Sequence, residues 1–262
     1  MKPPSFDYAR PETLDDALAL LGEDDAKVLA GGQSLLPALN MRLLRPALLV
    51  DVNRTTGLDV VTEAGGALRV GATVRQADAR LHAHPVLAEV LPHVGHTVTR
   101  NRGTVCGSIA HADAAAELPL ALLAVGGSAV VASSRGRREI AAENLFLGPY
   151  STALEADELV VETVWPSPAE GAGFAFEELA QRGGDFALCM AAALSHGDEL
   201  RVVVGSVTPA PTVLQVDPDR PGASAADQVE PWRSIHASPA FLRNLIRVLV
   251  DRAVARARER AT

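Results

Sequence analysis

Hydrophobic and polar positions alternate along the N-terminal part of the chain with the periods of short helices and short buried strands. The segment TLDDALALL begins at Thr13, which can cap a helix whose first turn is acidic, and Gly22 follows as a stop. The pattern predicts a helix, a strand, a second helix and a second strand at residues 13–21, 27–30, 34–44 and 47–52. This succession favours an α/β or α+β unit.

The following part of the chain predicts a second unit that is richer in strands. Residues 73–76 read TVRQ, which fits a capping box, and they predict a helix that ends before Pro85. Residues 97–103 are polar, which predicts a connecting segment between two elements. The other predicted elements are strands at residues 67–72, 128–133 and 159–165 and helices at residues 85–94 and 118–125.

A proline- and glycine-rich segment, PSPAEGAG at residues 166–173, predicts a domain boundary. Beyond it we expect a strand, a hairpin, a long loop and a final helix that Ser238 caps, at residues 174–180, 187–207, 208–231 and 238–260. The domain prediction is an N-terminal domain over residues 1–166, with subdomains at about 1–55 and 56–166, and a C-terminal α+β domain over residues 174–262.

Composition and charge narrow the function classes. The 262 residues are 48% hydrophobic and 21% charged with a mean hydropathy of +0.13, which excludes bulk disorder. The net charge of −8 argues against non-specific binding of nucleic acid or anionic membranes. The C-terminal arginines alternate with acidic residues, and we interpret them as a solvated helix face.

Two cysteines, Cys106 and Cys189, are too few for a disulfide framework, a structural zinc site or an iron–sulfur cluster. No stretch approaches the roughly 18 apolar residues of a membrane span, and no apolar leader follows Met1. We therefore expect a cytoplasmic, reduced protein.

A glycine pair joins the second predicted strand to the second predicted helix, in the sequence AGGQS. Gly31 and Gly32 permit backbone conformations closed to other residues and leave no Cβ to hold a ligand away. The helix that follows directs its free N–H groups at this turn, which suits a phosphate or pyrophosphate. A plain tight turn is the alternative interpretation.

A second small-residue loop, TVCGS, begins at Thr104 and precedes another helix. Two such loops can hold the two ends of one dinucleotide, but neither is the G-x-G-x-x-G fingerprint of a Rossmann fold. His111, Asp113 and Glu117 follow closely, and a metal cluster is the weaker interpretation because no second histidine lies nearby. The stronger interpretation is that these three residues cap helices and form hydrogen bonds within the loop.

Other candidates for chemistry are weaker. Cys106 would need a cationic neighbour to lower its pKa and act as a nucleophile, and the sequence assures none. Ser34 and Ser108 lack the nucleophile-elbow pattern. Trp165 and Trp232 are interpreted as packing residues. Four histidines are interpreted as surface or helix-end residues: His82, His84, His93 and His96.

The segments LAGGQSLLP and RNRGTVCGSIAHADAAAELP together resemble the two flavin loops of the FAD-binding subunits of molybdopterin dehydrogenases. This family includes the medium subunits of aerobic carbon monoxide dehydrogenases and the FAD domain of xanthine dehydrogenases. The resemblance extends through DVNRTTGLD, FEELAQRGGDFAL, VGSVTPAPT and IHASPAFLRNLIRVLVDRA. It implies an α+β chain with the PCMH-type (vanillyl-alcohol-oxidase-type) FAD-binding fold and a smaller C-terminal α+β domain.

The resemblance also implies which residues contact FAD. Both loops would bind the pyrophosphate and neighbouring groups, and Phe186 would lie beside the isoalloxazine. The implied residues are Ala30, Gly31, Gly32, Gln33, Ser34, Leu35, Thr104, Val105, Cys106, Gly107, Ser108, Asp113, Glu117, Val160, Glu177 and Phe186.

Three positions depart from the family pattern. Cys106 stands where a second glycine is usual, and Glu177 stands where some relatives have lysine. Gln33 stands where histidine or asparagine is frequent, and without a histidine in that loop we expect FAD to be bound non-covalently. We also expect no resident metal.

The implied function is electron transfer within a molybdenum hydroxylase complex. A large partner subunit would carry the molybdopterin and oxidise the substrate, and a small partner would carry [2Fe–2S] clusters, in a heterotrimer or its dimer. FAD would pass the electrons to a terminal acceptor, and no residue of this chain need act as an acid or base. The alternatives are a self-contained flavin oxidoreductase acting on a small substrate and a flavin-free scaffold subunit.

Overall fold

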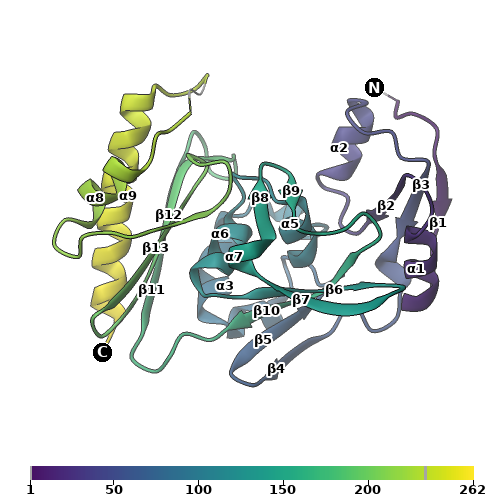
Figure 1. The fold of residues 1–262 in the computed structure, drawn as a ribbon, viewed down its shortest axis with the longest axis horizontal. Helices are drawn as coiled ribbons and strands as arrows, with labels where there is room; N and C mark the ends of the chain where they lie inside the picture. The colour runs from purple at the N-terminus through teal and green to yellow at the C-terminus, as the bar shows by residue number, and fades with distance from the viewer. Residues whose placement is uncertain (1, 233–234) are drawn as a thin grey trace.

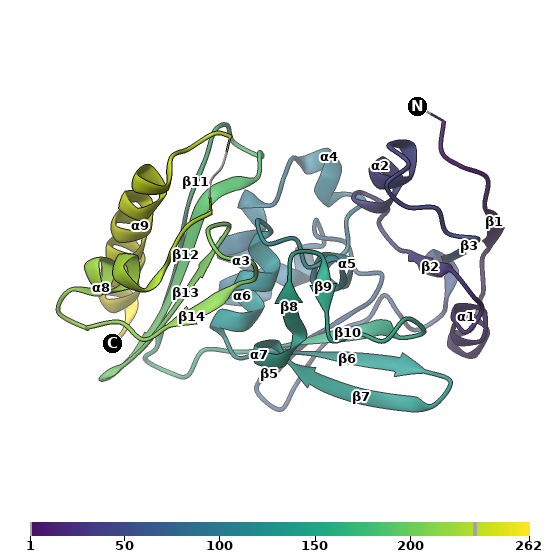
Figure 2. The same ribbon diagram turned by 45° about the horizontal axis from the view of Figure 1, so that its top comes forward.

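A computed structural model describes residues 2–232 and 235–262 of the chain. Three larger β-sheets follow one another along the longest axis, from the N-terminal sheet at the right of Figure 1 to the C-terminal sheet at its left. Helices fill the space between the middle and C-terminal sheets and cover the outer face of the latter, as Figure 2 also shows. The mixed helix and sheet content agrees with the predicted α+β class.

The N-terminal sheet is parallel and has the order β1-β3-β2. Its elements are β1 (Asp7–Ala9), α1 (Leu14–Leu21), β2 (Ala26–Leu29), α2 (Leu35–Asn40) and β3 (Leu48–Asp51). Thr13 caps α1 by accepting a hydrogen bond from the backbone N–H of Asp16, as predicted. Because β2 and β3 are parallel, with Leu29 opposite Asp51, the segments that follow the two strands leave the sheet at the same edge.

The middle sheet is antiparallel and has the order β4-β5-β10-β6-β7. Its strands are β4 (Val61–Ala64), β5 (Ala67–Gly71), β6 (Ser128–Ser133), β7 (Gly136–Ala141) and β10 (Leu159–Pro166). The helices of this part are η1 (Val52–Arg54), η2 (Ala79–Ala83), α3 (Pro85–Val90), η3 (Leu91–His93), α4 (Thr97–Arg100), α5 (Val105–His111), α6 (Glu117–Ala124) and α7 (Ala142–Leu145). A small hairpin follows, made of β8 (Phe146–Gly148) and β9 (Ser151–Thr152).

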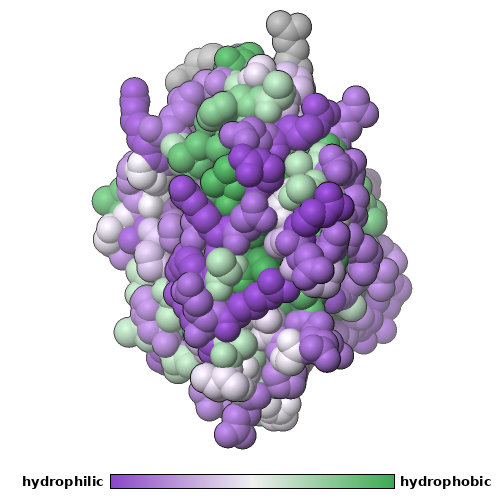
Figure 3. Space-filling model, turned by 90° about the vertical axis from the view of Figure 1, so that its left-hand side faces the viewer, coloured by the Kyte–Doolittle hydropathy of each residue, from purple (hydrophilic) through white to green (hydrophobic). Residues whose placement is uncertain are grey.

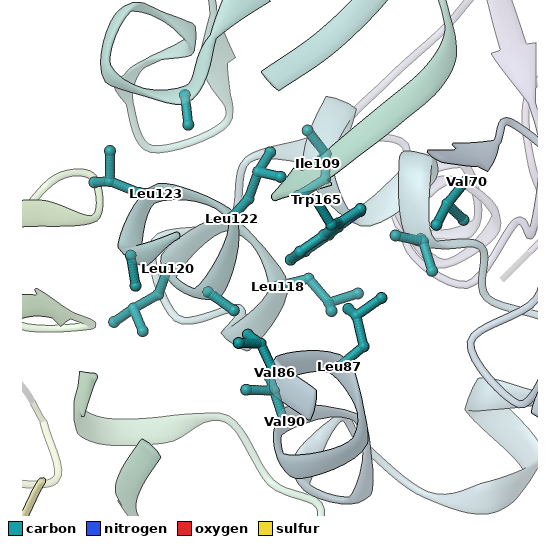
Figure 4. Packing of buried hydrophobic residues seen from close by; sticks show 14 of the residues in the cluster. Val70, Val86, Leu87, Val90, Ile109, Leu118, Leu120, Leu122, Leu123 and Trp165 are labelled. Atoms are coloured by element: carbon teal, nitrogen blue, oxygen red, sulfur yellow. The ribbon is translucent and has the colours of Figure 1, made fainter. Parts of the chain in front are cut away.

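Helix α6 is buried on every side because it lies between two sheets. It packs against β12 and β13 of the C-terminal sheet and against α3 and α5. Figure 4 shows its leucines pointing in several directions, with Leu118 on the side of Leu87 and Trp165 and with Leu120 and Leu123 on the opposite side. The main hydrophobic core therefore joins the middle part to the C-terminal sheet, and Trp165 is a packing residue, as predicted.

The C-terminal part is an antiparallel sheet with two helices on its outer face. Its elements are β11 (Gly173–Ala180), β12 (Ala187–His196), β13 (Glu199–Gly205), β14 (Thr212–Leu214), α8 (Pro221–Gln228) and α9 (Pro239–Arg260). Side chains alternate along β11: Phe174 and Phe176 enter the main core, whereas Ala175 packs in the separate core beneath α9. The outward face of this part, turned to the viewer in Figure 3, is mostly hydrophilic.

Some sequence predictions about local structure are wrong. Residues 73–76 form no helix, because the backbone N–H of Gln76 donates to the carbonyl of Gly103 and that of Ala77 donates to Arg100. The second helix ends early, at Asn40, since Arg42 adopts a left-handed conformation (φ 59°). The region predicted as loop between residues 208 and 231 contains β14 and α8.

The C-terminal arginines are not all solvated. Arg256 of α9 forms ion pairs with Glu89 of α3 and with Glu177, and Arg260 pairs with the same Glu89. Arg260 also donates to the carbonyl of Phe174 at 2.6 Å. These arginines therefore connect the last helix to the middle part of the molecule.

Candidate functional site

The two glycine loops lie directly against each other. We call residues 30–35, which connect β2 to the first residue of α2, the first loop, and residues 102–108, which include the first turn of α5, the second loop. A Cβ placed on Gly31 would lie 2.5 Å from the carbonyl oxygen of Arg102 and 2.8 Å from the Cα of Gly103. Only a glycine at residue 31 permits this approach, so the structure brings together two loops that lie some 70 residues apart in the sequence.

A polar network fastens the two loops to each other. The Asn53 side-chain amide donates to the carbonyl of Ala30 at 2.8 Å. Arg75 donates to the Asn53 side-chain oxygen at 2.5 Å and, through its other terminal nitrogen, to the carbonyl of Arg102 at 2.6 Å. Asp51 accepts from the backbone N–H of Asn53 at 2.9 Å. Sequence reasoning missed these residues; the available signal was the polar DVN run that closes a buried strand.

Positive charge gathers where the loops meet. Burial lowers the pKa of Arg75, the neighbouring charge of Arg102 lowers it further, and Asp51 opposes this. The guanidinium stays charged, because the arginine pKa begins far above neutrality. An anion at this point would therefore meet two arginines, although the whole chain carries a net charge of −8.

The first loop offers backbone donors. Gly32 has a left-handed conformation (φ 73°), and its carbonyl accepts from the N–H of Leu36 in the first turn of α2. Within the described part of the chain, the N–H groups of residues 32–34 have no intramolecular acceptor. Such a run of free N–H groups in a turn is suited to an anion.

The second loop is closed by its own cap. Thr104 accepts a hydrogen bond from the backbone N–H of Gly107 at 3.0 Å, and a Cβ on Gly107 would lie 2.6 Å from that hydroxyl oxygen. Cys106 points away from the loop into the core, is only 2% exposed, and its thiol donates to the carbonyl of Val70 at 3.3 Å. Burial raises the pKa of Cys106 to about 12. The thiol is thus an inert group of the core.

A third segment reaches the same region from the C-terminal sheet. The turn between β11 and β12 contains Gly184 (φ 86°), and a Cβ there would lie 2.5 Å from the ring of His96, which precedes α4. Phe186 follows in this turn and is 66% exposed. The segment from His96 to Gly103 therefore contacts both the first loop and this turn, which places an exposed aromatic ring on the same side of the molecule.

Asp113 lies at the other end of α5, beside an aromatic pair. The Tyr150 hydroxyl donates to Asp113 at 3.2 Å, and the Tyr150 ring lies 5.0 Å from the ring of His111. Tyr150 (φ 56°) and Ala112 (φ 50°) are both left-handed, and the N–H of Tyr150 donates to the carbonyl of Ala112. Sequence reasoning missed Tyr150, which carried no local motif.

Glu117 begins α6 and is 5% exposed. Burial raises its pKa to about 7; the charge of Glu178 adds to the shift and that of His93 opposes it. The His93 ring bonds Glu178 at 2.9 Å, and this bond raises the pKa of His93 although burial opposes it. His93 lies at the end of η3, as predicted for a surface or helix-end residue, and it also bonds Glu178.

Two predicted contacts lie away from the loops. Val160 is a core residue of β10, paired with Val131 of β6. Glu177 points to the α9 side of β11, where Arg256 binds it, whereas its neighbour Glu178 faces the main core and His93. The geometry gives these two side chains no route to the loops, so their assignment remains a prediction.

Among the described residues, no group of three or more metal-binding side chains is placed to hold a metal ion. None of the described helices is long and apolar enough to cross a membrane. The glycine contact, the free N–H groups and the paired arginines instead fit the pyrophosphate of a dinucleotide.

Comparisons with known proteins identify the family of the chain. Residues 4–168 match the family model described as the FAD binding domain in molybdopterin dehydrogenase. The chain is 37% identical to the 6-hydroxypseudooxynicotine dehydrogenase complex subunit alpha of Paenarthrobacter nicotinovorans, over 100% of this chain and 97% of that one. It is 35% identical to the carbon monoxide dehydrogenase medium chain of Hydrogenophaga pseudoflava, over 97% and 88%.

Solved structures show the same fold. A carbon monoxide dehydrogenase from Hydrogenophaga pseudoflava superposes with a TM-score of 0.94 at 31% identity and full coverage of both chains. Quinoline 2-oxidoreductase from Pseudomonas putida 86 superposes with a TM-score of 0.91 at 35% identity and 99% coverage of both. The family predicted from the two loops is thereby confirmed, and the similarity extends over the whole chain. This protein belongs to the family of FAD-binding domains of molybdopterin dehydrogenases.

Proposed function

We propose that this chain binds one FAD non-covalently and passes electrons from iron–sulfur clusters to a terminal acceptor within a molybdenum hydroxylase complex. The contact of Gly31 with the Arg102–Gly103 backbone supports the proposal, because it brings the two predicted flavin loops side by side. Membership of the family makes the chain an FAD-binding subunit of an oxidoreductase.

In the proposed site, the two loops hold the pyrophosphate. The N–H groups of residues 32–34 would donate to its oxygens, and Arg75 and Arg102 would neutralise part of its charge. Phe186 would cover one face of the isoalloxazine, with Asp113 and Glu117 near the flavin as the family resemblance implies. Bound FAD supplies redox chemistry that exchanges electrons singly and in pairs, while the protein supplies orientation and electrostatics.

The proposed assembly includes a small [2Fe–2S] subunit and a large molybdopterin subunit, in a heterotrimer or its dimer. The relatives support this, since they are named as a medium chain or as a subunit of a dehydrogenase complex. We propose a cytoplasmic location, which the free thiols Cys106 and Cys189 support. We also propose that residues 167–173 separate an FAD-binding domain from a C-terminal domain, because they connect β10 to β11 of a different sheet.

The test is whether flavin reduction needs partners. The chain is loaded with FAD and mixed anaerobically with carbon monoxide, a purine, nicotinate and an aldehyde, and flavin absorbance is followed. We expect no bleaching by any of them, and bleaching when a reduced two-cluster [2Fe–2S] protein from the same complex is added. Substrate-dependent bleaching by the chain alone would support the self-contained oxidoreductase, and failure to take up FAD would support the scaffold.

A further inference from the structure

The hydrogen bonds around Asp51 extend beyond the two loops to the exposed edge of the N-terminal sheet. β1 is an edge strand of this sheet (Figure 1), and its Tyr8 lies opposite Leu49 of β3. Asp51 follows Leu49 by two residues, so the side chains of Tyr8 and Asp51 lie on the same face of the sheet. The Tyr8 hydroxyl donates a hydrogen bond to one carboxylate oxygen of Asp51, although Tyr8 itself is 52% exposed.

Asp51 is the acceptor that orients the side chain of Asn53. It is only 7% exposed, and its other oxygen accepts from the backbone N–H and the side-chain amide of Asn53, at 2.9 and 2.5 Å. Burial alone would raise the pKa of Asp51, but the hydrogen bonds from Tyr8 and Asn53 and the charge of Arg10 together lower it. The group is therefore an ionised carboxylate at neutral pH and can only accept hydrogen bonds. The NH2 group of Asn53 must then face Asp51, and the Asn53 side-chain oxygen is left to face the other way.

This orientation allows Asn53 to reach both loops at once. Its NH2 group donates to the carbonyl of Ala30 in the first loop at 2.8 Å. Its side-chain oxygen accepts from Arg75 at 2.5 Å, and Arg75 donates to the carbonyl of Arg102 in the second loop at 2.6 Å. A reversed amide would set an oxygen against the Ala30 carbonyl and an NH2 group against the guanidinium, and would break both bonds. Asp51 thereby selects the one orientation in which Asn53 joins the loops.

We propose that Tyr8 and Asp51 are positioning residues of the FAD site: the Tyr8 hydroxyl holds the Asp51 carboxylate, which keeps Asn53 in the orientation that ties the two loops together. This inference rests on the proposed function, because it takes the two loops as the site of the pyrophosphate. Without the Tyr8 hydroxyl the carboxylate is held from one side only, and Asn53 is free to leave the orientation that joins the loops. FAD binding must then restore that orientation, and the cost of doing so lowers the affinity.

Charge and position act in opposite directions at Asp51. Its negative charge acts on Arg75 and so reduces the attraction of this point for an anion. If repulsion were its whole influence on FAD, removal of the carboxylate would tighten FAD binding. If Asp51 positions Asn53, its removal weakens FAD binding. The sign of the change therefore separates the two roles.

The experiment measures the Kd for FAD by fluorescence quenching in the full-length chain and its variants, and circular dichroism verifies that each apo-variant is folded. In Tyr8→Phe, which loses only the hydroxyl, we expect the Kd to rise about three- to tenfold. In Asp51→Leu, which removes the charge and both acceptor oxygens at similar volume, we expect a rise of about 10- to 100-fold. The matched control is Ser128→Ala, which removes another hydroxyl that donates to a carboxylate, that of Glu139 in β7, and should bind FAD like the parent.

A double variant provides a readout that a general loosening of the fold would not give. In Asn53→Ala the connection from Tyr8 to the loops is cut, so the addition of Tyr8→Phe should leave the Kd of Asn53→Ala unchanged. The same addition should still lower the thermal unfolding midpoint, because the bond between Tyr8 and Asp51 is present in both backgrounds. An equal loss of FAD affinity from Tyr8→Phe in both backgrounds would overturn the inference.

Failure of this inference is distinguishable from failure of the proposed function. If the parent binds FAD and Tyr8→Phe binds it equally well, the inference is overturned and the proposed function stands. The same holds if a folded Asp51→Leu binds FAD as tightly as the parent or more tightly, and if Asp51→Leu does not fold, Tyr8→Phe alone decides. A parent chain that does not bind FAD at any concentration would instead contradict the proposed function.

Discussion

A single methyl group at Gly31 should separate the two loops. In Gly31→Ala the new Cβ would lie 2.5 Å from the Arg102 carbonyl oxygen, whereas ordinary van der Waals contacts begin at 3.4 Å. The obstacle is backbone rather than a flexible side chain, so the loops must move apart by roughly 0.9 Å, and such a shift at a preorganised site is costly. Gly31 has no left-handed φ, so alanine adds a steric clash without backbone strain.

The expected magnitude follows from this displacement. Overpacking typically costs about 1–3 kcal/mol of folding stability, which a domain of ordinary stability survives. Separating the loops also lengthens the bond from Arg75 to the Arg102 carbonyl and moves the free N–H groups of residues 32–34 relative to the second loop. We expect FAD affinity to fall by about 10- to 100-fold, which corresponds to about 1.4–2.7 kcal/mol.

The assay is equilibrium quenching of FAD fluorescence, with circular dichroism to verify that each apo-variant is folded. Gly148→Ala is the matched control, because a Cβ at this glycine meets nothing within 4 Å and no left-handed φ is present. The control should bind FAD like the parent. A folded Gly31→Ala chain with parental affinity would refute the argument that the loop contact builds the site.

Cys106→Gly should leave the FAD affinity within about twofold of the parental value but lower the free energy of unfolding by about 1–2 kcal/mol, since it empties a core position. In the parent, the Cys106 thiol has a pKa of about 12 and should not react with a thiol reagent until the chain unfolds. Arg75→Met should cost about 1–3 kcal/mol in thermal or urea unfolding by leaving loop acceptors unpaired, and should weaken FAD binding in the same titration. Phe186→Ala should weaken FAD binding and alter the flavin absorption bands, whereas Phe186→Tyr should preserve both, because the proposed site sets the exposed ring of Phe186 against the flavin. The apo-chain should lose stability as pH rises, because folding raises the pKa of Glu117 from 4.5 to about 7, and up to about 3 kcal/mol of unfolding free energy is lost between those values. The raised pKa of His93 extends this loss to higher pH. Urea unfolding of Glu117→Gln should therefore depend less on pH than that of the parent.

Local sequence patterns predicted the loops and most of the elements, because caps and glycines act over a few residues. Thr13 and Ser238 cap their helices as expected, and the first loop connects a strand to a helix. The helix prediction for the TVRQ segment is wrong because the backbone N–H groups there donate to distant carbonyls, those of Gly103 and Arg100, and so cannot form helical hydrogen bonds. A local pattern carries no information about such a partner.

The remaining parts of the site depend on long-range packing. Asn53 meets the first loop because parallel β2 and β3 end at the same edge of their sheet. Arg75 comes from a different sheet and joins Asn53 to the carbonyl of Arg102 in the second loop. The assignment of Glu177 shows a second limit. Side chains alternate along a strand, so only one of Glu177 and Glu178 can face the middle part of the molecule. The packing of β11 against α9 decides that Glu178 faces the middle part and Glu177 faces α9.

Titration of the flavin-free chain with FAD tests the central claim most directly. The free and bound FAD are separated by ultrafiltration, and the bound fraction is precipitated with acid. We expect saturable binding of about one FAD per chain, with all the yellow colour released into the supernatant by acid. A folded chain that shows no saturable uptake of FAD, or one that retains the colour in the precipitate, would contradict it.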